Sequence, residues 1–417
     1  MQKKFEQRTA HTWQKWVAIG LLSSGLLYAN GTMAQNASLV DTEASKKTGY
    51  LYDQMHLLSG KGLMLGHQDD TSYGVNWWDM SVSKGFGKWR KNQPSDTKRS
   101  IGVYPAVYGW DLGHIGEPNN LDKVPFEKVR ENIIKAYRRG GINTVSWHMK
   151  NLKTGSSSWD TTQVVKDMLP GGTLHGKFKE KLDLVADFLH SLNYWGEPIP
   201  VLFRPWHEMT GKWFWWGEGN CTTEEYKALY KFTVEYLRDV KQVHNLIYVY
   251  STDRFDSEET YLKYYPGDAY VDVLGFDDYH SLKPENSASG PTLFAKEVQI
   301  VVKLAKEKGK LSAMTETGLI GLPDTTWFSQ SLLSNIMKSE EGKQLSYVLV
   351  WRNANIEHDR PDHFCVPHEG HPSVADFKEF YQSPFTLFED QLPDMYKKVK
   401  GKDNQNGKDK QADAVVQ

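Results

Sequence analysis

The chain contains the segment Pro200-Val201-Leu202-Phe203-Arg204-Pro205-Trp206-His207-Glu208-Met209, in which an apolar run leads directly into polar and aromatic residues. The run has the length of a β-strand and is not broken by alternating polar positions. Uninterrupted hydrophobicity over this length is typical of a parallel strand that is covered on both faces. The segment therefore predicts a buried strand whose carboxyl end carries a group of polar side chains.

Seven other apolar runs of the same kind occur along the chain. They cover residues 62–66, 101–108, 144–147, 246–250, 271–276, 311–315 and 346–350. Most of the intervals between them have apolar residues at steps of three and four, which predicts helices at 126–139, 178–192, 224–243, 293–308 and 328–338. Thr222 and Glu225 have the spacing of a capping box at the start of the third of these helices. The interval between the first two strands shows no clear helix.

Eight strands that alternate with helices predict an α/β fold. Eight such units favour closure into a (β/α)8 TIM barrel, which we expect to form a single catalytic domain over residues 35–395. A doubly wound open sheet is the alternative that the same alternation leaves open.

The two ends of the chain differ from this domain. Basic residues, a short apolar stretch and small residues that end at Ala34 predict a secretory signal peptide over residues 1–34. The apolar stretch is too short for a spanning helix, so we expect a secreted or periplasmic protein without a membrane span. Residues 396–417 are polar and predict a disordered tail. Whether the two cysteines, Cys221 and Cys365, form a disulfide stays open.

Charge and aromatic content narrow the classes of function. The formal net charge is −2 and the body of the chain has no long basic run, which argues against a nucleic-acid partner. The chain has 15 Trp and 21 Tyr, and several of these residues stand beside polar ones. This favours either aromatic rings that stack on the flat faces of sugars or an aromatic-rich core.

Polar and aromatic residues follow the predicted strands, at the end of the barrel where active sites of this fold lie. They include His67, Trp110, Asp111, His148, Arg204, His207, Glu208, Asp277, Tyr279, Glu316, Trp351 and Arg352. Glu208 ends the fourth strand and Glu316 ends the seventh, so the two carboxyl groups are expected on one rim.

Two carboxyl groups on one rim match the requirements of acetal hydrolysis. One protonates the leaving oxygen, and the other, if it lies roughly 5–5.5 Å away, attacks the anomeric carbon so that configuration is retained. Repulsion and burial would separate their pKa values, so that one stays protonated near neutral pH. The alternative is that Glu208 and Glu316 only form structural ion pairs with Arg204 or Arg352.

The segment Arg204–Gly217 resembles the acid/base motif of family-26 glycoside hydrolases, chiefly β-mannanases. The segments 66–68, 275–279, 315–318 and 351–353 are also similar to family segments and follow in the same order, so that the resemblance spans residues 45–385. It implies a two-glutamate barrel in which Glu208 is the general acid/base and Glu316 the nucleophile.

The resemblance also implies roles for neighbouring residues. His207 would orient the acid/base region, His148 and Trp351 would line the subsite of the cleaved sugar, and Trp213 would stack on sugar. Tyr279 would hydrogen-bond the nucleophile, with Asp277 beside it, and Arg352 would contact sugar on the non-reducing side. From their places after the first two strands, His67, Trp110 and Asp111 complete the expected substrate-binding set. Thr210 stands where many relatives carry Asn, which leaves one polar contact open.

Together these features predict a retaining hydrolase of β-1,4-mannosidic bonds in mannan, glucomannan or galactomannan, acting as a monomer without cofactor or metal. His358, His363, His368 and His371 lie near Cys365, but their spacing fits no zinc motif, so we expect a polar loop there. A xylanase, a mixed-linkage β-glucanase and a non-catalytic sugar-binding protein are the alternatives. Endo or exo action stays open because loops decide it.

Overall fold

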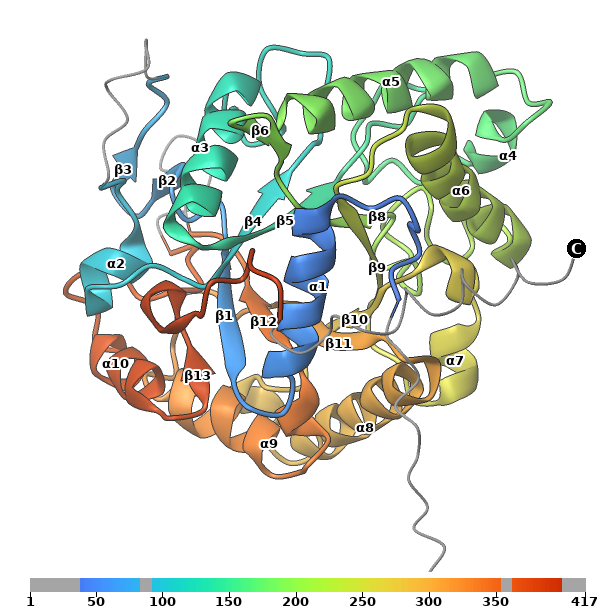
Figure 1. Ribbon diagram of the computed structural model, residues 1–417. Helices are drawn as coiled ribbons and strands as arrows, with labels where there is room; N and C mark the ends of the chain where they lie inside the picture. Colours follow the sequence, from blue (N-terminus) through green and yellow to red (C-terminus); the bar gives the residue numbers. More distant parts are fainter. Residues whose placement is uncertain (1–37, 83–91, 354–361, 400–417) are drawn as a thin grey trace, which may run out of the picture. The chain divides into compact units, whose positions relative to one another are not determined.

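The computed structural model of the chain describes residues 38–82, 92–353 and 362–399, and its centre is a closed barrel of parallel strands (Figure 1). The barrel strands are β1 Leu63–Gln68, β4 Val107–Asp111, β5 Ile142–Trp147, β8 Val201–Pro205, β9 Leu246–Thr252, β10 Val273–Asp277, β11 Leu311–Thr317 and β12 Tyr347–Val350. They pair in chain order, and β12 also pairs with β1, which closes the ring. This confirms the (β/α)8 barrel and excludes the open sheet.

Helices surround the barrel, and small hairpins decorate it (Figure 1). The α-helices are α1 Lys46–Leu58, α2 Asp96–Ile101, α3 Phe126–Arg139, α4 Val165–Met168, α5 His175–Ser191, α6 Thr223–Glu235, α7 Glu258–Leu262, α8 Gly290–Lys308, α9 Ser334–Met337 and α10 Val374–Gln382. Two π-helical segments, η1 Tyr236–Val240 and η4 Trp327–Leu333, and the 3-10 turns η2 Asp268–Tyr270, η3 Pro284–Asn286, η5 Gly342–Gln344 and η6 Glu389–Gln391 complete them. The short strands are β2 Tyr73–Gly74, β3 Trp77–Trp78, β6 Asn193–Tyr194, β7 Glu197–Pro198 and β13 Thr386–Leu387.

The second predicted strand, 101–108, was wrong at its start. Helix α2 ends at Ile101, and β4 begins only at Val107. The Ser95 hydroxyl caps α2 by accepting the Lys98 backbone N–H at 3.0 Å, and Gly102 ends the helix with φ 91°. The apolar residues before Val107 therefore belong to the end of α2 and to the loop that connects it to β4. A run of apolar residues alone does not distinguish these from a strand.

Helix α3 has the predicted bounds, 126–139, and most other predicted helices form with different ends. The capping box of α6 is present, since Thr222 N donates to Glu225 at 2.8 Å and Glu225 N donates to Thr222 Oγ1 at 3.2 Å. The regular helix stops at Glu235, however, and continues as η1, while the region predicted as helix 328–338 is η4 followed by α9. Apolar residues at steps of three and four do not distinguish a short π-helical segment from an α-helix. Helices α1, α2, α4, α7 and α10 were not predicted.

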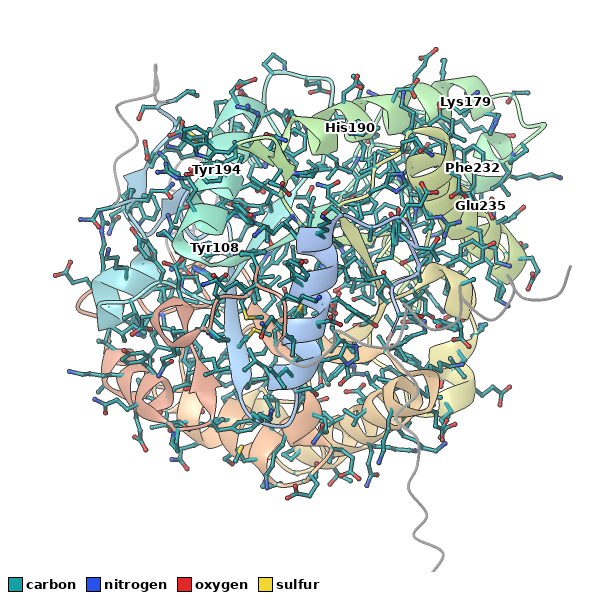
Figure 2. The ribbon with its side chains drawn as sticks, in the orientation of Figure 1. Tyr108, Lys179, His190, Tyr194, Phe232 and Glu235 are labelled. Atoms are coloured by element: carbon teal, nitrogen blue, oxygen red, sulfur yellow. The ribbon has the colours of Figure 1, made fainter. Side chains whose placement is uncertain are left out.

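Alternating side chains divide the core into an inner and an outer part. The inner cluster contains Met64, Val107, Ile142, Leu202, Ile247, Val273, Leu311 and Tyr347 from the eight strands, together with Leu51, Tyr52 and Met55 of α1. Helix α1 therefore closes the amino end of the barrel. The residues next in each strand face the surrounding helices, and side chains fill that outer layer (Figure 2). Because strand side chains alternate, the same inward-facing register brings Gln68, Asp111, Arg204, Ser251 and Asp277 to the carboxyl end of the barrel.

The packed chain extends past the boundary predicted at residue 395. Tyr396 is buried, its hydroxyl donates to Gly141 O at 2.7 Å, and its ring centroid lies 4.4 Å from that of Tyr137. The predicted signal peptide and residues 400–417 of the predicted tail lie outside the described residues. Within the described part, no helix has the length and hydrophobicity to cross a membrane.

Candidate active site

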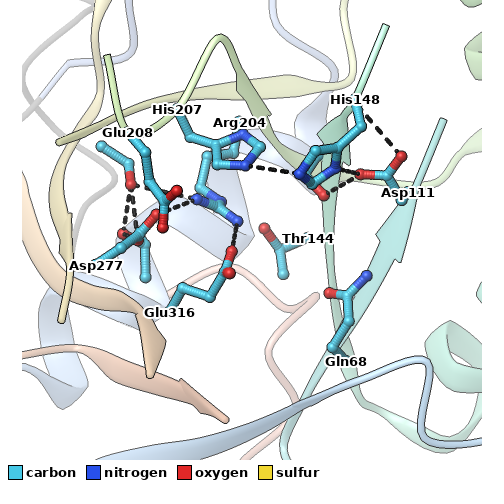
Figure 3. Close-up of polar contacts among 12 residues, drawn as sticks. Gln68, Asp111, Thr144, His148, Arg204, His207, Glu208, Asp277 and Glu316 are labelled. Atoms are coloured by element: carbon cyan, nitrogen blue, oxygen red, sulfur yellow. Dashed lines mark hydrogen bonds and ion pairs between the residues drawn. The ribbon is translucent and has the colours of Figure 1, made fainter. Parts of the chain in front are cut away.

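Arg204 joins two carboxylates at the carboxyl end of the barrel (Figure 3). Its Nη1 donates to Oδ2 of Asp277 at 2.7 Å, and its Nη2 donates to Oε2 of Glu316. The other oxygen of Asp277 accepts from the hydroxyls of Ser251 at 2.8 Å and Thr315 at 2.6 Å. Burial disfavours the charged guanidinium, but the charges of Asp277 and Glu316 outweigh burial and raise the pKa of Arg204. One guanidinium thus faces two carboxylates in a buried cluster, and burial together with the charge of Glu316 raises the pKa of Asp277 to about 7 against the opposing charge of Arg204.

A β-bulge in β11 brings Glu316 into this cluster. Met314 pairs with Phe276 of β10, but Glu316, two residues on, pairs with the next residue, Asp277. The pairing of β11 with β12 shifts at the same place. The extra residue lets both Thr315 and Glu316 contact partners inside the barrel, which strict alternation would forbid. Bulges beside active sites commonly redirect a side chain in this way.

Glu208 reaches the same rim from a strained turn after β8. Trp206 has φ 55° and Glu208 has φ 54°, a left-handed conformation that is unusual for residues other than glycine. The Glu208 backbone N–H donates to Ser251 O at 2.9 Å, and the Tyr226 hydroxyl holds the Trp206 carbonyl at 2.8 Å. The Trp206 ring enters the outer core, and the Glu208 side chain lies toward Arg204 and Asp277 (Figure 3). Strain of this kind persists where surrounding contacts hold it, often at functional sites.

Burial and neighbouring negative charges keep Glu208 protonated. Burial raises the pKa of Glu208 well above its usual range, and the charges of Glu316, Asp277 and Asp253 raise it further. Its Oε2 accepts a hydrogen bond from the indole N–H of Trp213 at 2.9 Å. A carboxylic acid that stays neutral near pH 7 is suited to donate a proton.

Glu316 has a different environment. The Tyr279 hydroxyl donates to its Oε1 at 2.7 Å, so each carboxylate oxygen of Glu316 faces a donor, Tyr279 on one and Arg204 on the other. Burial and the charge of Glu316 raise the pKa of Tyr279, so the tyrosine keeps the proton that it donates. The arrangement places a glutamate whose protonated form is favoured beside a carboxylate that two donors hold in a fixed orientation.

Two histidines form a chain that starts at Asp111 (Figure 3). Oδ2 of Asp111 lies 2.6 Å from Nδ1 of His148, and Nε2 of His148 lies 3.2 Å from Nε2 of His207. Burial disfavours the imidazolium of His148, but the charge of Asp111 and its hydrogen bond outweigh burial and raise the pKa. Burial, Arg204 and His148 together lower the pKa of His207 well below its usual value. A charged His148 donates through both nitrogens, so His207 accepts at Nε2 and carries its proton on Nδ1.

Aromatic rings border these groups. Trp213 and Trp351 are partly exposed, and Trp351 lies 6.4 Å from His148 between ring centroids. Trp215 and Trp216 are fully buried and support the turn that carries Glu208. One ring of the tryptophan cluster is thus available to a ligand while the others pack.

Two predicted substrate-binding residues, Trp110 and His67, lie apart from the group. Trp110 is fully buried, faces the helices and donates its indole N–H to Asn143 at 2.9 Å. His67 is 1% exposed, and its Nδ1 lies 2.7 Å from Oδ1 of Asp70. Each residue alternates with an inward-facing neighbour, Gln68 or Asp111, and therefore points outward, so the structure does not bring either of them together with the two glutamates.

Arg352 lies on the part of the rim near the first two strands. Its Nε is 3.7 Å from Oδ1 of Asp122, and both side chains are mostly buried. The pair acts on Asp69, whose pKa is raised well above its usual value by burial and by the charge of Asp122, against the opposing charge of Arg352. Arg352 is thus a mostly buried cation that lies near the acidic side chains of Asp122 and Asp69.

Some residues of the site were not predicted. Arg204 was considered only as an ion-pair partner, although it links both Glu316 and Asp277. Asp253 follows β9, the fifth barrel strand, and its charge raises the pKa of Glu208. Its place at a strand end is the sequence feature that could have indicated it. Phe214, whose ring lies 5.3 Å from that of His148, belongs to the acid/base segment but was given no role there, and Asp122 lies outside every motif named above.

The histidines and cysteines predicted to lie in a polar loop can be placed in part. Among the described residues, no group of three or more His, Cys, Asp or Glu side chains is arranged to hold a metal ion. His358 lies outside the described residues, while His368 and His371 pack against Phe364 in edge-to-face contacts. Cys221 and Cys365 are both free thiols.

Comparison with known proteins gives one family. The model of glycosyl hydrolase family 26 matches residues 40–353. The mannan endo-1,4-beta-mannosidase of Bifidobacterium adolescentis is 36% identical over 379 residues, covering 85% of this chain and 36% of the relative. The enzyme of the same name from Bacillus subtilis is 34% identical over 194 residues, covering 44% of this chain and 52% of the relative. The chain thus spans about a third to a half of the length of these curated relatives.

Solved structures agree. The family-26 β-mannanase of Bacteroides ovatus superposes with a TM-score of 0.78 and 41% identity, covering 85% of this chain and 98% of that chain. The match confirms the resemblance that the acid/base segment indicated. The family model extends from before β1 to just beyond the eighth strand, and the barrel within it carries Glu208 and the ion-paired Glu316 on one rim. The chain therefore belongs to glycosyl hydrolase family 26.

Proposed function

We propose that the protein is a mannan endo-1,4-β-mannosidase that cleaves β-1,4-mannosidic bonds with retention of configuration. The observation that carries the proposal is the unequal environment of two coupled glutamates. Glu208 is kept protonated by burial and by the charge of Glu316, whereas Glu316 is held by Arg204 and Tyr279. One acid and one oriented carboxylate are the two groups that double displacement needs.

In the first step Glu208 donates its proton to the glycosidic oxygen while Glu316 attacks the anomeric carbon. The bond to the leaving sugar breaks, and an ester between Glu316 and the glycone forms. As charge leaves the Glu316 carboxylate, its hold on Arg204 weakens, and Asp277 remains to balance the guanidinium. The loss of charge on Glu316 also removes one cause of the raised pKa of Glu208, which favours its conversion to a base.

In the second step Glu208, now a carboxylate, takes a proton from water, which attacks the anomeric carbon and releases Glu316. The indole N–H of Trp213 at 2.9 Å orients the Glu208 carboxylate in this state. The starting protonation states are restored, and the configuration has been inverted twice.

Neighbouring side chains are proposed to bind the substrate. His148, His207 and Trp351 would line the subsite of the cleaved sugar, and Trp213 would stack on a sugar ring. The Asp111 contact fixes which histidine carries the charge, so the donors that a sugar hydroxyl meets are set in advance. Arg352 would contact sugar toward the non-reducing end, beside Asp122.

Mannan is proposed over other β-glycans because the two curated relatives compared above are named mannan endo-1,4-beta-mannosidases and the solved neighbour a β-mannanase. The same names favour internal cleavage. A xylanase or mixed-linkage glucanase would use the same two glutamates, so only substrate assays separate these activities. A sugar-binding protein without activity would not require a protonated carboxyl group that is coupled to a second carboxylate.

The test is digestion of mannan, glucomannan, galactomannan, xylan and mixed-linkage glucan by the wild type and by E316A, with product lengths followed over time. We expect a ladder of manno-oligosaccharides from the mannans and none with E316A. Mannobiose alone from the first minutes would replace endo with exo action. Cleavage of xylan or glucan in preference to mannan, or equal activity of E316A, would overturn the proposal.

We also propose that residues 1–34 direct export and that the protein is secreted or periplasmic and acts as a monomer. The basic start and apolar stretch of this segment support export. Mass spectrometry of protein recovered outside the cytoplasm tests it, with cleavage after Ala34 as the expected result, and light scattering of the same material measures the mass in solution.

A further inference from the structure

A second pair of carboxyl groups lies directly behind the active site. Asp278 stands between Asp277, which binds Arg204, and Tyr279, which binds Glu316. Glu297 lies on α8 and is 0% exposed, and Asp278 is 1% exposed. The described mechanism uses neither of them, although Asp278 belongs to the segment that positions two of its groups.

Each of these carboxyl groups uses one oxygen to fix a backbone segment. Oε1 of Glu297 accepts the backbone N–H of Phe255 at 3.1 Å, and Oδ1 of Asp278 accepts the backbone N–H groups of His280 at 2.7 Å and Ser281 at 2.9 Å. The backbone of Asp278 is also held, since its N–H donates to Glu316 O at 3.0 Å and its carbonyl accepts from the Thr317 hydroxyl at 2.7 Å.

The remaining oxygens, Oε2 of Glu297 and Oδ2 of Asp278, are buried, and neither receives a hydrogen bond from an N–H or hydroxyl group. Two carboxylates can only accept, so a hydrogen bond between them requires a proton on one of them. Without it, two negative charges would be buried together, which is strongly unfavourable unless each charge is compensated. Arg254 is a positive charge that acts on Glu297.

We infer that Glu297 is protonated in the active protein and shares its proton with Asp278, and that this bond fixes the segment that presents Asp277 and Tyr279 to Arg204 and Glu316. Glu297 is then a positioning residue that acts through Asp278. The inference rests on the proposed function for its effect on activity, whereas the shared proton itself does not depend on what the protein hydrolyses.

The electrostatics of the surroundings agree with this geometry. Burial raises the pKa of Glu297 to about 9, the charge of Asp278 and a hydrogen bond with Asp278 contribute to the rise, and the Phe255 N–H and Arg254 oppose it. Asp253 is the other acidic group of this region, and burial together with the charge of Asp278 raises its pKa to about 6, against Arg254. Glu297 therefore keeps its proton under conditions in which Asp253 has largely lost its own.

Thermal unfolding tests the shared proton without a substrate. Unfolding restores the ordinary pKa of Glu297 near 4.5, so between about pH 5 and 9 the folded chain holds one more proton and loses stability as pH rises. In E297Q the amide donates to Asp278 and does not ionise. We expect the Tm of wild type to fall more steeply over this range than that of E297Q, while E307Q, an exposed glutamate of the same helix, follows wild type. Equal slopes for wild type and E297Q would overturn the inference.

Kinetics test the positioning role. An aryl β-mannobioside with a dinitrophenol leaving group needs no proton from Glu208, so its kcat/KM reports the other groups. We expect wild type to lose kcat/KM above about pH 9 and E297Q to keep it. E297L, which cannot donate to Asp278, should lose about tenfold in kcat, with E297Q restoring it. Full activity of E297L, or the same alkaline loss in E297Q, would overturn the positioning role. Because the unfolding experiment needs no activity, absence of mannan hydrolysis would be a separate failure of the proposed function.

Discussion

The Tyr279 hydroxyl donates a hydrogen bond to Oε1 of Glu316 at 2.7 Å. Tyr279 lies in the segment after β10, and Glu316 lies at the bulge in β11. The contact depends on the shifted pairing of the two strands, which places Glu316 opposite Asp277 rather than one position later. A hydrogen bond to a charged carboxylate is stronger than one between neutral groups. Tyr279 therefore fixes the orientation of the Glu316 carboxylate, which is proposed to attack the anomeric carbon.

Replacing Tyr279 by Phe removes this donor and leaves the ring in place. A hydrogen bond to a charged group contributes about 1.5–3 kcal/mol, so kcat/KM on mannan should fall by about 10- to 100-fold. Y381F, which alters a partly buried tyrosine that donates to Asp390, is the control and should match wild type. Unchanged kinetics in Y279F would contradict the role assigned to the contact.

Replacing Glu208 by Ala separates proton donation from attack. Loss of a positioned general acid should lower kcat/KM on mannan by about 10²–10⁴-fold. With an aryl mannoside whose leaving group needs no proton, formation of the ester on Glu316 should stay fast and hydrolysis of that ester should become slow. Mass spectrometry should then detect the covalent intermediate in E208A. E218Q, which alters a nearby surface glutamate paired with Lys263, should behave as wild type. Equal losses on both substrates would assign Glu208 another role.

Removing the charge of Asp253 should lower the pKa of Glu208. Negative neighbours disfavour the Glu208 carboxylate, and Asp253 is one of them, so its replacement makes ionisation easier. We expect the alkaline limb of the kcat/KM profile of D253N to move to lower pH, by about half a pH unit. The measurement is hydrolysis of mannan from pH 4 to 10, with D256N, an exposed neighbour, as the control. A shift to higher pH would show that the coupling has the opposite sign.

The Asp111–His148 pair should make stability depend on pH. Burial acts against the Asp111 carboxylate, but the charge of His148 and its hydrogen bonds outweigh burial and lower the pKa, while the pKa of His148 is raised. The stabilisation that comes from the Asp111 carboxylate is lost as pH falls below about 4. The stabilisation that comes from the protonated His148 is lost as pH rises above about 6.5 through the raised pKa of His148. D111N should therefore be less stable than wild type by about 3 kcal/mol between these pH values, and by less above them.

Urea unfolding of D111N and wild type at a series of pH values measures this difference. The control is E117Q, which removes an exposed carboxylate that pairs with Lys150. Its unfolding free energy should stay within about 0.5 kcal/mol of wild type. A deficit in D111N that does not vary with pH would mean that the pair acts through packing and not through charge.

The barrel could be predicted because each of its strands is an unbroken apolar run covered on both faces. The exception is the segment before β4, where Ser95 and Gly102 define a helix that the apolar residues alone do not reveal. The end of α6 and the π-helix η4 were not predicted for a similar reason, since apolar spacing does not distinguish a π-helical segment from an α-helix. Helix α1 was missed although it buries Leu51 and Met55, because nothing local indicates that it closes the barrel.

The site could be predicted as far as strand ends determine it. Glu208, Glu316, His148 and Asp277 lie on the rim, as their places at the strand ends indicate. Trp110 and His67 point outward because each stands one residue from an inward-facing neighbour, a property that depends on the register of the strand. The bulge that turns Glu316 inward depends on tertiary pairing, and so does the contact between Glu297 on α8 and Asp278 after β10. No spacing along the chain contains either relationship.

Closure of the barrel base by α1 predicts a stability effect without an effect on catalysis. Met55 is 0% exposed and packs with the inner cluster at the amino end, whereas the two glutamates lie at the carboxyl end. M55A leaves a cavity that the surrounding strands cannot fill, and should lower the free energy of unfolding by about 2–5 kcal/mol. L57A alters a residue of the same helix that is 44% exposed and should cost less than about 0.5 kcal/mol. Because the strands between α1 and the site are rigidly paired, kcat on mannan at 25 °C should be the same in M55A, L57A and wild type. A fall in kcat of M55A at temperatures where it remains folded would show that the base of the barrel influences the geometry around Glu316.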